Sequence, residues 1–353
     1  MRKFATLLLL LTLLNTAFTQ TPGLRWLRSL GGTGSDAANF SFKTSDGGLL
    51  MIGSTKSNDK DVFGNHGDLD VWVVKMTKAG IVEWRKCLGG TSFDIPVAAV
   101  YQNQSLTIIA NTWSYNGDVS GYHGAGDIWV VKLDGNGNIL WQKTLGGSDT
   151  EQAMDIIALN GGGYAICGST QSTNGDVTGN QYGGNLWVFR LDENGALQWQ
   201  KALGGYGQEA IRTAKIIESS NGSLLIGSET SSNNGDVSGN NGGFDAWVSR
   251  LSAGGSLVWQ KCLGGVANEF FADIKEAADG SVFVLSQTSS YNLPSFHGTN
   301  TDYADVYLAR LSSSGSLLQH RCYGSSIGDE PYELMPQADG GVVLSAVVRN
   351  KDG

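Results

Sequence analysis

Short apolar runs of roughly four to eight residues recur along the chain, separated by stretches rich in Gly, Asn and Asp. β-Branched and aromatic residues fill these runs, and such runs bounded by turn residues predict β-strands. One stretch shows the pattern in full, with strands expected at 154–159, 164–169, 186–191 and 197–203. After the first twenty residues no segment carries the 3.6-residue period of an amphipathic helix, so the pattern predicts an all-β fold.

This group of four strands repeats with a nearly constant period. An aromatic residue of the fourth strand recurs at steps of 58, 57, 58, 60 and 60 residues, at Trp26, Trp84, Trp141, Trp199, Trp259 and, replaced, Gln319. The aromatic of the third strand always precedes it by twelve residues, as Trp129 precedes Trp141. Constant spacing fixes the register of that hairpin, and a period of this size marks a repeat architecture.

Four antiparallel strands per repeat, stacked around an axis, make the blade of a β-propeller. Aromatic side chains would fill the wedge between blades, so we expect Trp141→Ala to cost about 3–5 kcal/mol of unfolding free energy. The chain begins with a lone fourth strand around Trp26, continues through five complete blades, and ends with two strands at 332–348. We expect a C-terminally incomplete ring of six or more blades.

The repeat resembles a known family. The segment DIWVVKLDGNGNILWQKTLGGSDTEQA (127–153), with GGYAICGST (162–170), is similar to the bacterial secreted β-propeller repeat of the SBBP type. More weakly, the turn between its last two strands resembles quinoprotein propeller repeats. The resemblance covers about residues 24 to 348 and implies a propeller in an exported or surface-attached protein. It implies no particular activity, because such propellers serve many roles.

Residues 1–19 have the composition of a signal peptide. Arg2 and Lys3 precede an apolar run at 7–14, and Ala17 and Thr19 suit cleavage after Thr19. The predicted organisation is therefore a signal peptide at 1–19 and a propeller domain at 20–353. The apolar run is too short to span a membrane, so we expect a secreted or cell-surface protein without a transmembrane segment in the mature chain.

The composition and net charge of the chain limit the classes of binding partner that we expect. Gly, at 50 of 353 residues, is about twice its usual share but lies at fixed turn positions, and hydrophobic residues at 41% suffice for a core. Removal of Arg2 and Lys3 would take the net charge from −9 to −11. Such an acidic chain disfavours nucleic acid or an anionic membrane as partner. Cations, cationic proteins and neutral glycans remain.

The four cysteines are expected to be small buried hydrophobes. Cys87, Cys262 and Cys322 occupy one repeat position, so they lie a blade or more apart, too far for a disulfide. Cys167 replaces an apolar residue of a second strand.

One acid per repeat follows the Leu-Gly-Gly motif (Tyr-Gly-Ser in the last copy). The set is Asp36, Asp94, Glu151, Glu209, Glu269 and Asp329. These acids could ring the mouth of the central channel as a cation site or a polar ligand rim. They could instead be structural, each carboxylate accepting backbone N–H groups from an adjacent turn, which would also explain their regular repetition.

The loops between second and third strands carry a second acidic pattern, comprising Asp61, Asp118, Asp176 and Asp236, then Asp70, Asp127, Asn185 and Asp245 nine residues later. Oxygen-rich loops of this kind could bind Ca²⁺, but the same residues also form Asx turns and strand entries. The histidines lack zinc-ligand spacing.

The least regular loop, 291–303, presents Tyr291, Phe296 and His297 as a candidate surface for glycan stacking or protein contact.

The sequence favours a non-catalytic extracellular propeller that binds a protein or glycan through one face. No catalytic residue is assigned, since the G-x-S-x-G string at 324–328 lies in a loop with no helix after it. The alternatives are an exported enzyme, glycan-active or quinone-dependent, and a structural spacer in a larger surface protein. An enzyme should show one pocket where unlike polar groups converge, and a spacer none.

Overall fold

The computed structural model describes residues 24–180, 183–297, 303–325 and 328–349, so the signal peptide expected at 1–19 lies outside it. The described residues form 22 strands and no helix. Accordingly, this part of the chain contains no helical segment of the length and apolar character needed to cross a membrane.

Twenty of the strands form five antiparallel four-stranded sheets, which we call blades 1 to 5. Blade 1 consists of β1 (Asp36–Lys43), β2 (Leu49–Thr55), β3 (Asp70–Met76) and β4 (Val82–Leu88). Blade 2 consists of β5 (Asp94–Gln102), β6 (Ser105–Thr112), β7 (Asp127–Leu133) and β8 (Ile139–Leu145). Blade 3 consists of β9 (Glu151–Ala158), β10 (Tyr164–Thr170), β11 (Asn185–Leu191) and β12 (Leu197–Leu203).

The remaining strands continue the series. Blade 4 consists of β13 (Lys215–Glu218), β14 (Leu224–Thr230), β15 (Asp245–Leu251) and β16 (Leu257–Leu263). Blade 5 consists of β17 (Glu269–Glu276), β18 (Val282–Thr288), β19 (Asp305–Leu311) and β20 (Leu317–Tyr323). A two-stranded sheet follows, made of β21 (Glu330–Pro336) and β22 (Val342–Val347).

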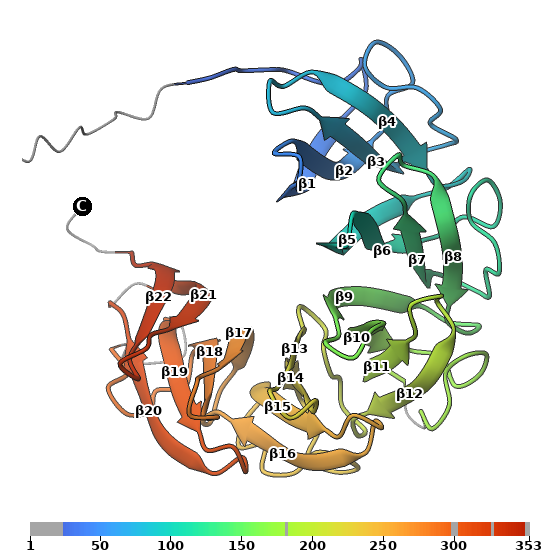
Figure 1. Ribbon diagram of the computed structural model, residues 1–353. Coiled ribbons are helices and arrows are strands. Elements are labelled where there is room, and N and C mark those ends of the chain that lie inside the picture. The colour runs from blue at the N-terminus through green and yellow to red at the C-terminus, as the bar shows by residue number, and fades with distance from the viewer. Residues whose placement is uncertain (1–23, 181–182, 298–302, 326–327, 350–353) are drawn as a thin grey trace, which may run out of the picture.

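The sheets follow one another around a common centre, with each blade's first strand innermost and its fourth strand outermost (Figure 1). Blade 1 and the β21–β22 sheet lie on either side of an opening in the ring. This arrangement is a β-propeller, so the predicted fold class is confirmed. The five complete blades and the two strands after them also lie where the sequence placed them.

Strand boundaries agree with the sequence to within a few residues. In blade 3, β9 begins earlier than expected because Glu151 already pairs with Thr170 of β10. The segment around Trp26 was expected to be a strand and is not one. The outermost strand of a blade pairs only with the third strand of its own blade, and no such partner lies beside Trp26 in the described residues.

Aromatic residues fill the wedges between blades, and they come from two repeat positions, one in the third strand and one in the fourth. The third-strand aromatics Trp129, Trp187 and Trp247 are completely buried. Trp141, whose burial we expected, is half-buried on the outer strand. The reason is topological: the third strand lies inside the sheet, whereas the fourth is its edge.

All four cysteines are buried and free, as predicted. Burial raises the pKa of the thiols of Cys87, Cys262 and Cys322 to about 12, and that of Cys167 well above its usual value.

Candidate binding face and the acids beneath it

Two sets of loops form one face of the propeller, which we call the loop face. One set joins the fourth strand of a blade to the first strand of the next; the other joins second to third strands within a blade. The amide N–H of Thr91, in the first kind of loop, donates to Oδ1 of Asn116, in the second kind, at 2.9 Å. The same bond recurs from Ser148 to Asn174, from Tyr206 to Asn234 and from Val266 to Asn292.

Close backbone approach supports this face. Gly117, which follows Asn116, has φ of 71°, and a Cβ there would lie 2.3 Å from the carbonyl oxygen of Gly89. Only glycine fits such a contact in the left-handed region. The loops of the face are therefore held to one another by side-chain amides and by glycines.

The six acids that follow the Leu-Gly-Gly motif lie beneath this face. Asp94, Glu151, Glu209, Glu269 and Asp329 are 0% exposed, and Asp36 is half-buried. In Glu151, Oε2 accepts the N–H of Gly147 at 2.8 Å and Oε1 accepts the hydroxyl of Thr170 at 2.6 Å. These contacts match the structural alternative given for the acids from the sequence. In it, each carboxylate links the start of a blade to the second strand of that blade and to the preceding turn.

A second buried position lies opposite five of these acids, all but Asp36, at the start of the third strand. It is occupied by Asp70, Asp127, Asn185, Asp245 and Asp305. In all five the Oδ1 atom is buried without a hydrogen-bond partner among the described residues. Sequence reasoning treated Asp70, Asp127, Asn185 and Asp245 as loop oxygens and did not name Asp305. It missed that each of the five faces an acid at the start of the next sheet.

Glycine in the Leu-Gly-Gly motif lets the two facing side chains come close together. A Cβ on Gly146, the first glycine of its motif, would lie 2.5 Å from Oε2 of Glu151 and 2.6 Å from Oδ1 of Asp127. Equivalent glycines separate the pairs at the other blade junctions. The recurring Leu-Gly-Gly motif was therefore the sequence signal for the pairing.

Three histidines bind the third-strand acids. Nδ1 of His66 lies 2.8 Å from Oδ2 of Asp70, and His123 and His297 repeat the contact with Asp127 and Asp305 at 2.9 and 2.8 Å. These three rings are the histidines of the second-to-third-strand loops, and in each the bond fixes the loop to a strand start.

The remaining loop acids also make internal contacts. Oδ2 of Asp118 accepts the N–H of Gly89 at 3.2 Å, and Asp61, Asp176 and Asp236 do the same for Gly31, Gly146 and Gly204. Within the described ranges, no three His, Cys, Asp or Glu side chains are grouped to hold a metal ion.

The three candidate residues of the irregular loop at 291–303 have different surroundings. Tyr291 is 57% exposed, Phe296 packs against the core cluster that contains Leu293, and His297 is bound to Asp305. Residues 298–302 lie outside the described residues. Of the three candidates, Tyr291 is the aromatic most open to solvent.

Two further tyrosines of the loop face were missed. Tyr115 is 72% exposed and Tyr206 is 68% exposed. Tyr115 occupies the same Ser-Tyr-Asn position in blade 2 as Tyr291 does in blade 5. That repeated tripeptide was a signal available in the sequence.

Blade 4 breaks the regular pattern. Its first strand, β13, is only four residues long, and the preceding segment contains Ala210 with φ of 52°. In this segment a side chain and not a neighbouring strand accepts a backbone hydrogen bond: Oε1 of Glu229 accepts the N–H of Arg212 at 2.6 Å. Burial raises the pKa of Glu229 to about 7. The Arg212 guanidinium lies 3.7 Å from the ring centre of Phe270.

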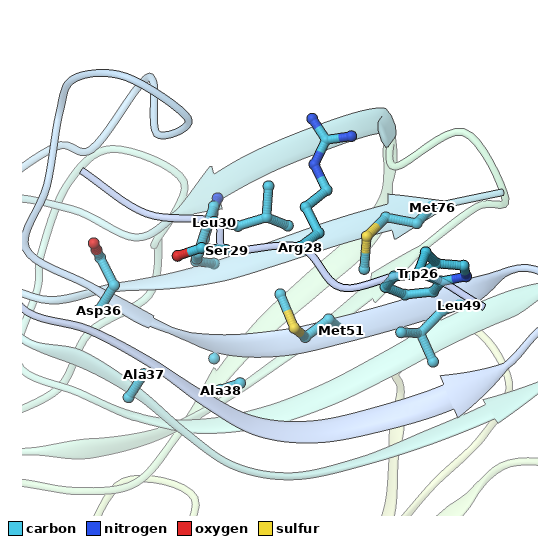
Figure 2. Close-up of a pocket in the computed structure, with 12 residues that line it drawn as sticks. Trp26, Arg28, Ser29, Leu30, Asp36, Ala37, Ala38, Leu49, Met51 and Met76 are labelled. Carbon is cyan, nitrogen blue, oxygen red and sulfur yellow. The ribbon is translucent and has the colours of Figure 1, made fainter. Parts of the chain in front are cut away.

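A small polar cavity lies against this irregular segment. Its volume is about 120 Å³, and Gln152, Ser169, Gln171, Gln208 and Ile211 are among its lining residues. A larger, mostly apolar cavity of about 330 Å³ lies elsewhere, on blade 1, where Trp26 and Leu30 approach Met51 and Met76 (Figure 2). In the other blades the preceding blade packs against the corresponding surface.

Comparison with known proteins gives distant similarities. No protein-family model matches the chain. Among curated proteins, the regulatory protein FlaEY of Caulobacter vibrioides is 28% identical over 171 residues, which cover 43% of this chain and only 17% of that protein.

The solved structures that match this chain share little sequence with it. Rhamnogalacturonan lyase YesW has 14% identity and a TM-score of 0.45, over 92% of this chain and 59% of that one. A puromycin hydrolase mutant has 11% identity and a TM-score of 0.45, over 90% and 43%. A protein of unknown function from Bacteroides caccae has 12% identity and a TM-score of 0.41, over 82% of both chains. The strand order and pairing described above carry the fold assignment.

Proposed function

We propose that this chain is a non-catalytic binding propeller of the bacterial secreted type, exported from the cell, that holds a protein or glycan ligand on its loop face. The observation that carries the proposal is the set of exposed tyrosines on that face, with Tyr115 and Tyr291 at matching loop positions. Export follows from the signal peptide expected at residues 1–19.

The tyrosines stand on loops whose backbone is held in place. Asn116 and Asn292, the residues after Tyr115 and Tyr291, each accept a backbone N–H from the neighbouring loop, at 2.9 and 3.0 Å. A tyrosine loses little conformational entropy on binding and offers both an apolar ring and a hydroxyl. Such residues on a fixed loop suit stacking on a sugar ring or packing against a protein.

The net charge and the irregular segment before β13 narrow the class of ligand that we expect. The net charge of −9 supports a neutral glycan or a cationic protein surface over nucleic acid. The irregular segment before β13, with its amide-lined cavity, distinguishes one sector of the loop face from the others. A purely structural spacer would have no use for such a departure, so we favour binding over the spacer.

The test is binding by the mature chain, residues 20–353. On an array of neutral and charged glycans we expect neutral ligands to be retained, and the variant Tyr115→Ala/Tyr291→Ala to bind them at least about tenfold more weakly, the loss of two stacking contacts. Leu140→Ala is the matched control, because Leu140 is about as exposed as Tyr291 but lies near the turn between third and fourth strands, away from the loop face.

A protein ligand is tested in parallel with a photo-crosslinking residue placed at position 115 or, as control, at position 140. Crosslinking to one discrete protein from position 115 alone would support the proposal. Equal binding by the double-tyrosine variant would contradict the assignment of the ligand site to Tyr115 and Tyr291. Capture of neither glycan nor protein would favour the spacer. Turnover of a retained glycan would favour the exported enzyme.

A further inference from the structure

The junction between blades 4 and 5 contains two buried carboxyl groups that face each other. Asp245, at the start of β15, and Glu269, at the start of β17, are both 0% exposed. A Cβ on Gly264 would lie 2.5 Å from Oδ1 of Asp245 and 2.1 Å from Oε2 of Glu269. The two oxygens therefore converge on the same point beside the Gly264 Cα.

Hydrogen bonds distinguish the two groups. Both oxygens of Glu269 accept bonds, from the N–H of Gly265 at 2.8 Å and from the hydroxyl of Thr288 at 2.5 Å. Oδ2 of Asp245 accepts the N–H of Asn241 at 3.1 Å, but Oδ1 has no partner in the part of the chain that the structure describes. The unpartnered oxygen is the one that faces Glu269.

In the part of the chain that the structure describes, no positively charged side chain is paired with either of these two carboxyl groups. The other titratable groups that bear on the pair are the Cys262 thiol of β16, the Tyr307 hydroxyl of β19 and the Cys322 thiol of β20. Burial raises the pKa of all three, so all three are neutral. No ion pair involves Asp245 or Glu269 among the described residues. Two adjacent buried carboxylates without a cation are costly.

The other junctions show how the same difficulty is resolved elsewhere. In blade 3 the third-strand residue is Asn185, a neutral isostere of a protonated Asp, facing Glu209. In blades 1, 2 and 5 the residue is Asp, and a histidine lies within 2.9 Å of its Oδ2. Blade 4 has Asn241 in place of that histidine, so Asp245 lacks both solutions.

We infer that the junction of blades 4 and 5 binds one proton, carried on Oδ1 of Asp245 and donated as a hydrogen bond to Oε2 of Glu269. The proton comes from solvent, and the pair then holds one neutral carboxylic acid and one carboxylate. The orphaned oxygen thereby becomes a donor, and Glu269 keeps its existing bonds. The site carries one net negative charge, as the Asn185–Glu209 junction does.

The pKa of Asp245 agrees with this placement of the proton. Burial, together with the charge of Glu269, raises it from an ordinary 3.8 to about 7. Below the ordinary pKa both folded and unfolded chains hold the proton, and the contribution to stability is complete. Between about 4 and about 7 only the folded chain holds it, so stability falls as pH rises, by up to about tenfold in the folding equilibrium constant per pH unit. Above about 7 the loss is complete.

The experiment compares the full mature chain with Asp245→Asn, which mimics the natural blade 3 junction. Thermal and urea unfolding are measured from about pH 4 to about pH 9. We expect Asp245→Asn to flatten the fall in stability and to unfold at higher denaturant than the wild type at alkaline pH. Asp149→Asn is the matched control, because Asp149 is exposed and its change should leave the profile unaltered.

Two further measurements keep the inference testable. Asn185→Asp places a second carboxyl beside Glu209 and should steepen the fall. The infrared difference spectrum of wild type minus Asp245→Asn near pH 6 should contain the carbonyl band of one buried carboxylic acid. Taking the difference removes the band of Glu229, whose pKa is also raised to about 7. An unchanged pH profile in Asp245→Asn together with no such band in the difference spectrum would overturn the inference, whether or not Asn185→Asp folds.

Discussion

At the scale of single residues, the buried third-strand tryptophans depend on an acceptor in the fourth strand. The indole Nε1 of Trp129 donates to Oε1 of Gln142 at 2.8 Å, and Trp187 and Trp247 have the same bond to Gln200 and Gln260. Blade 1 carries Arg85 at that position, and Nε1 of Trp72 is buried without a partner among the described residues. A buried donor without an acceptor destabilises the fold.

We therefore expect Arg85→Gln to stabilise the protein by about 1 kcal/mol, because the new amide oxygen can accept from Trp72. The gain is reduced by loss of the contacts that the half-buried Arg85 makes with Asp61 and Phe63, which are weak because solvent reaches them. Urea unfolding measures the change. Arg85→Met, which loses the same surface contacts and offers no amide oxygen, is the control, and equal stability of the two variants would contradict the explanation.

At the scale of elements, the fourth strand of each of blades 1 to 4 is fastened to the next blade by its tryptophan. Trp141 of β8 donates from Nε1 to the carbonyl oxygen of Glu193 at 2.9 Å, in the turn before β12. Its ring lies against Gly195, where a Cβ would be 2.7 Å away. The contact recurs at four other places, with donors Trp26, Trp84, Trp199 and Trp259.

This arrangement changes the expected cost of removing Trp141. Because the side chain is half-buried, Trp141→Ala should cost about 2 kcal/mol, whereas Trp187→Ala, in the sheet interior, should cost about 3–5 kcal/mol. Chemical denaturation of the two variants gives the comparison. A larger loss for Trp141→Ala would mean that contacts between blades outweigh packing within them.

At the scale of the whole molecule, stability comes from a series of similar junctions, and each blade packs chiefly on its neighbours in sequence. The ends of the series differ from its middle. The outer face of blade 1 is covered only in part, by the segment around Trp26 and Leu30, and leaves the cavity of Figure 2. Cys87 of blade 1 is 8% exposed, whereas Cys167 of blade 3 is 0% exposed.

The thiols should report this difference. With their pKa raised by burial, none should react with a thiol reagent in the native protein near neutral pH. In increasing urea, Cys87 should be labelled before Cys167, because local opening begins where fewest contacts are lost. Mass spectrometry of a Cys262→Ala/Cys322→Ala variant identifies the order, and earlier labelling of Cys167 would contradict it.

The sequence by itself determined the repeat, the strands and the blade. Apolar runs, Gly-rich turns and the constant spacing from Trp129 to Trp141 are local features, and antiparallel hairpins follow from local pairing. The burial of the cysteines was also predicted, from the strand position that Cys87, Cys262 and Cys322 share and from the replacement of an apolar strand residue by Cys167. The loop face could be located from topology alone, and Tyr291 within it from its irregular loop.

Only the tertiary structure decided which residues of neighbouring repeats meet. Trp141 on Gly195 and Asp245 opposite Glu269 are contacts between blades, and their geometry depends on the angle at which successive sheets pack. The alternation of residues along a strand says which face a side chain is on, but not what lies across the junction. The six acids could therefore be found in the sequence, whereas the burial of five of them and the pairing of four with a second carboxyl could not.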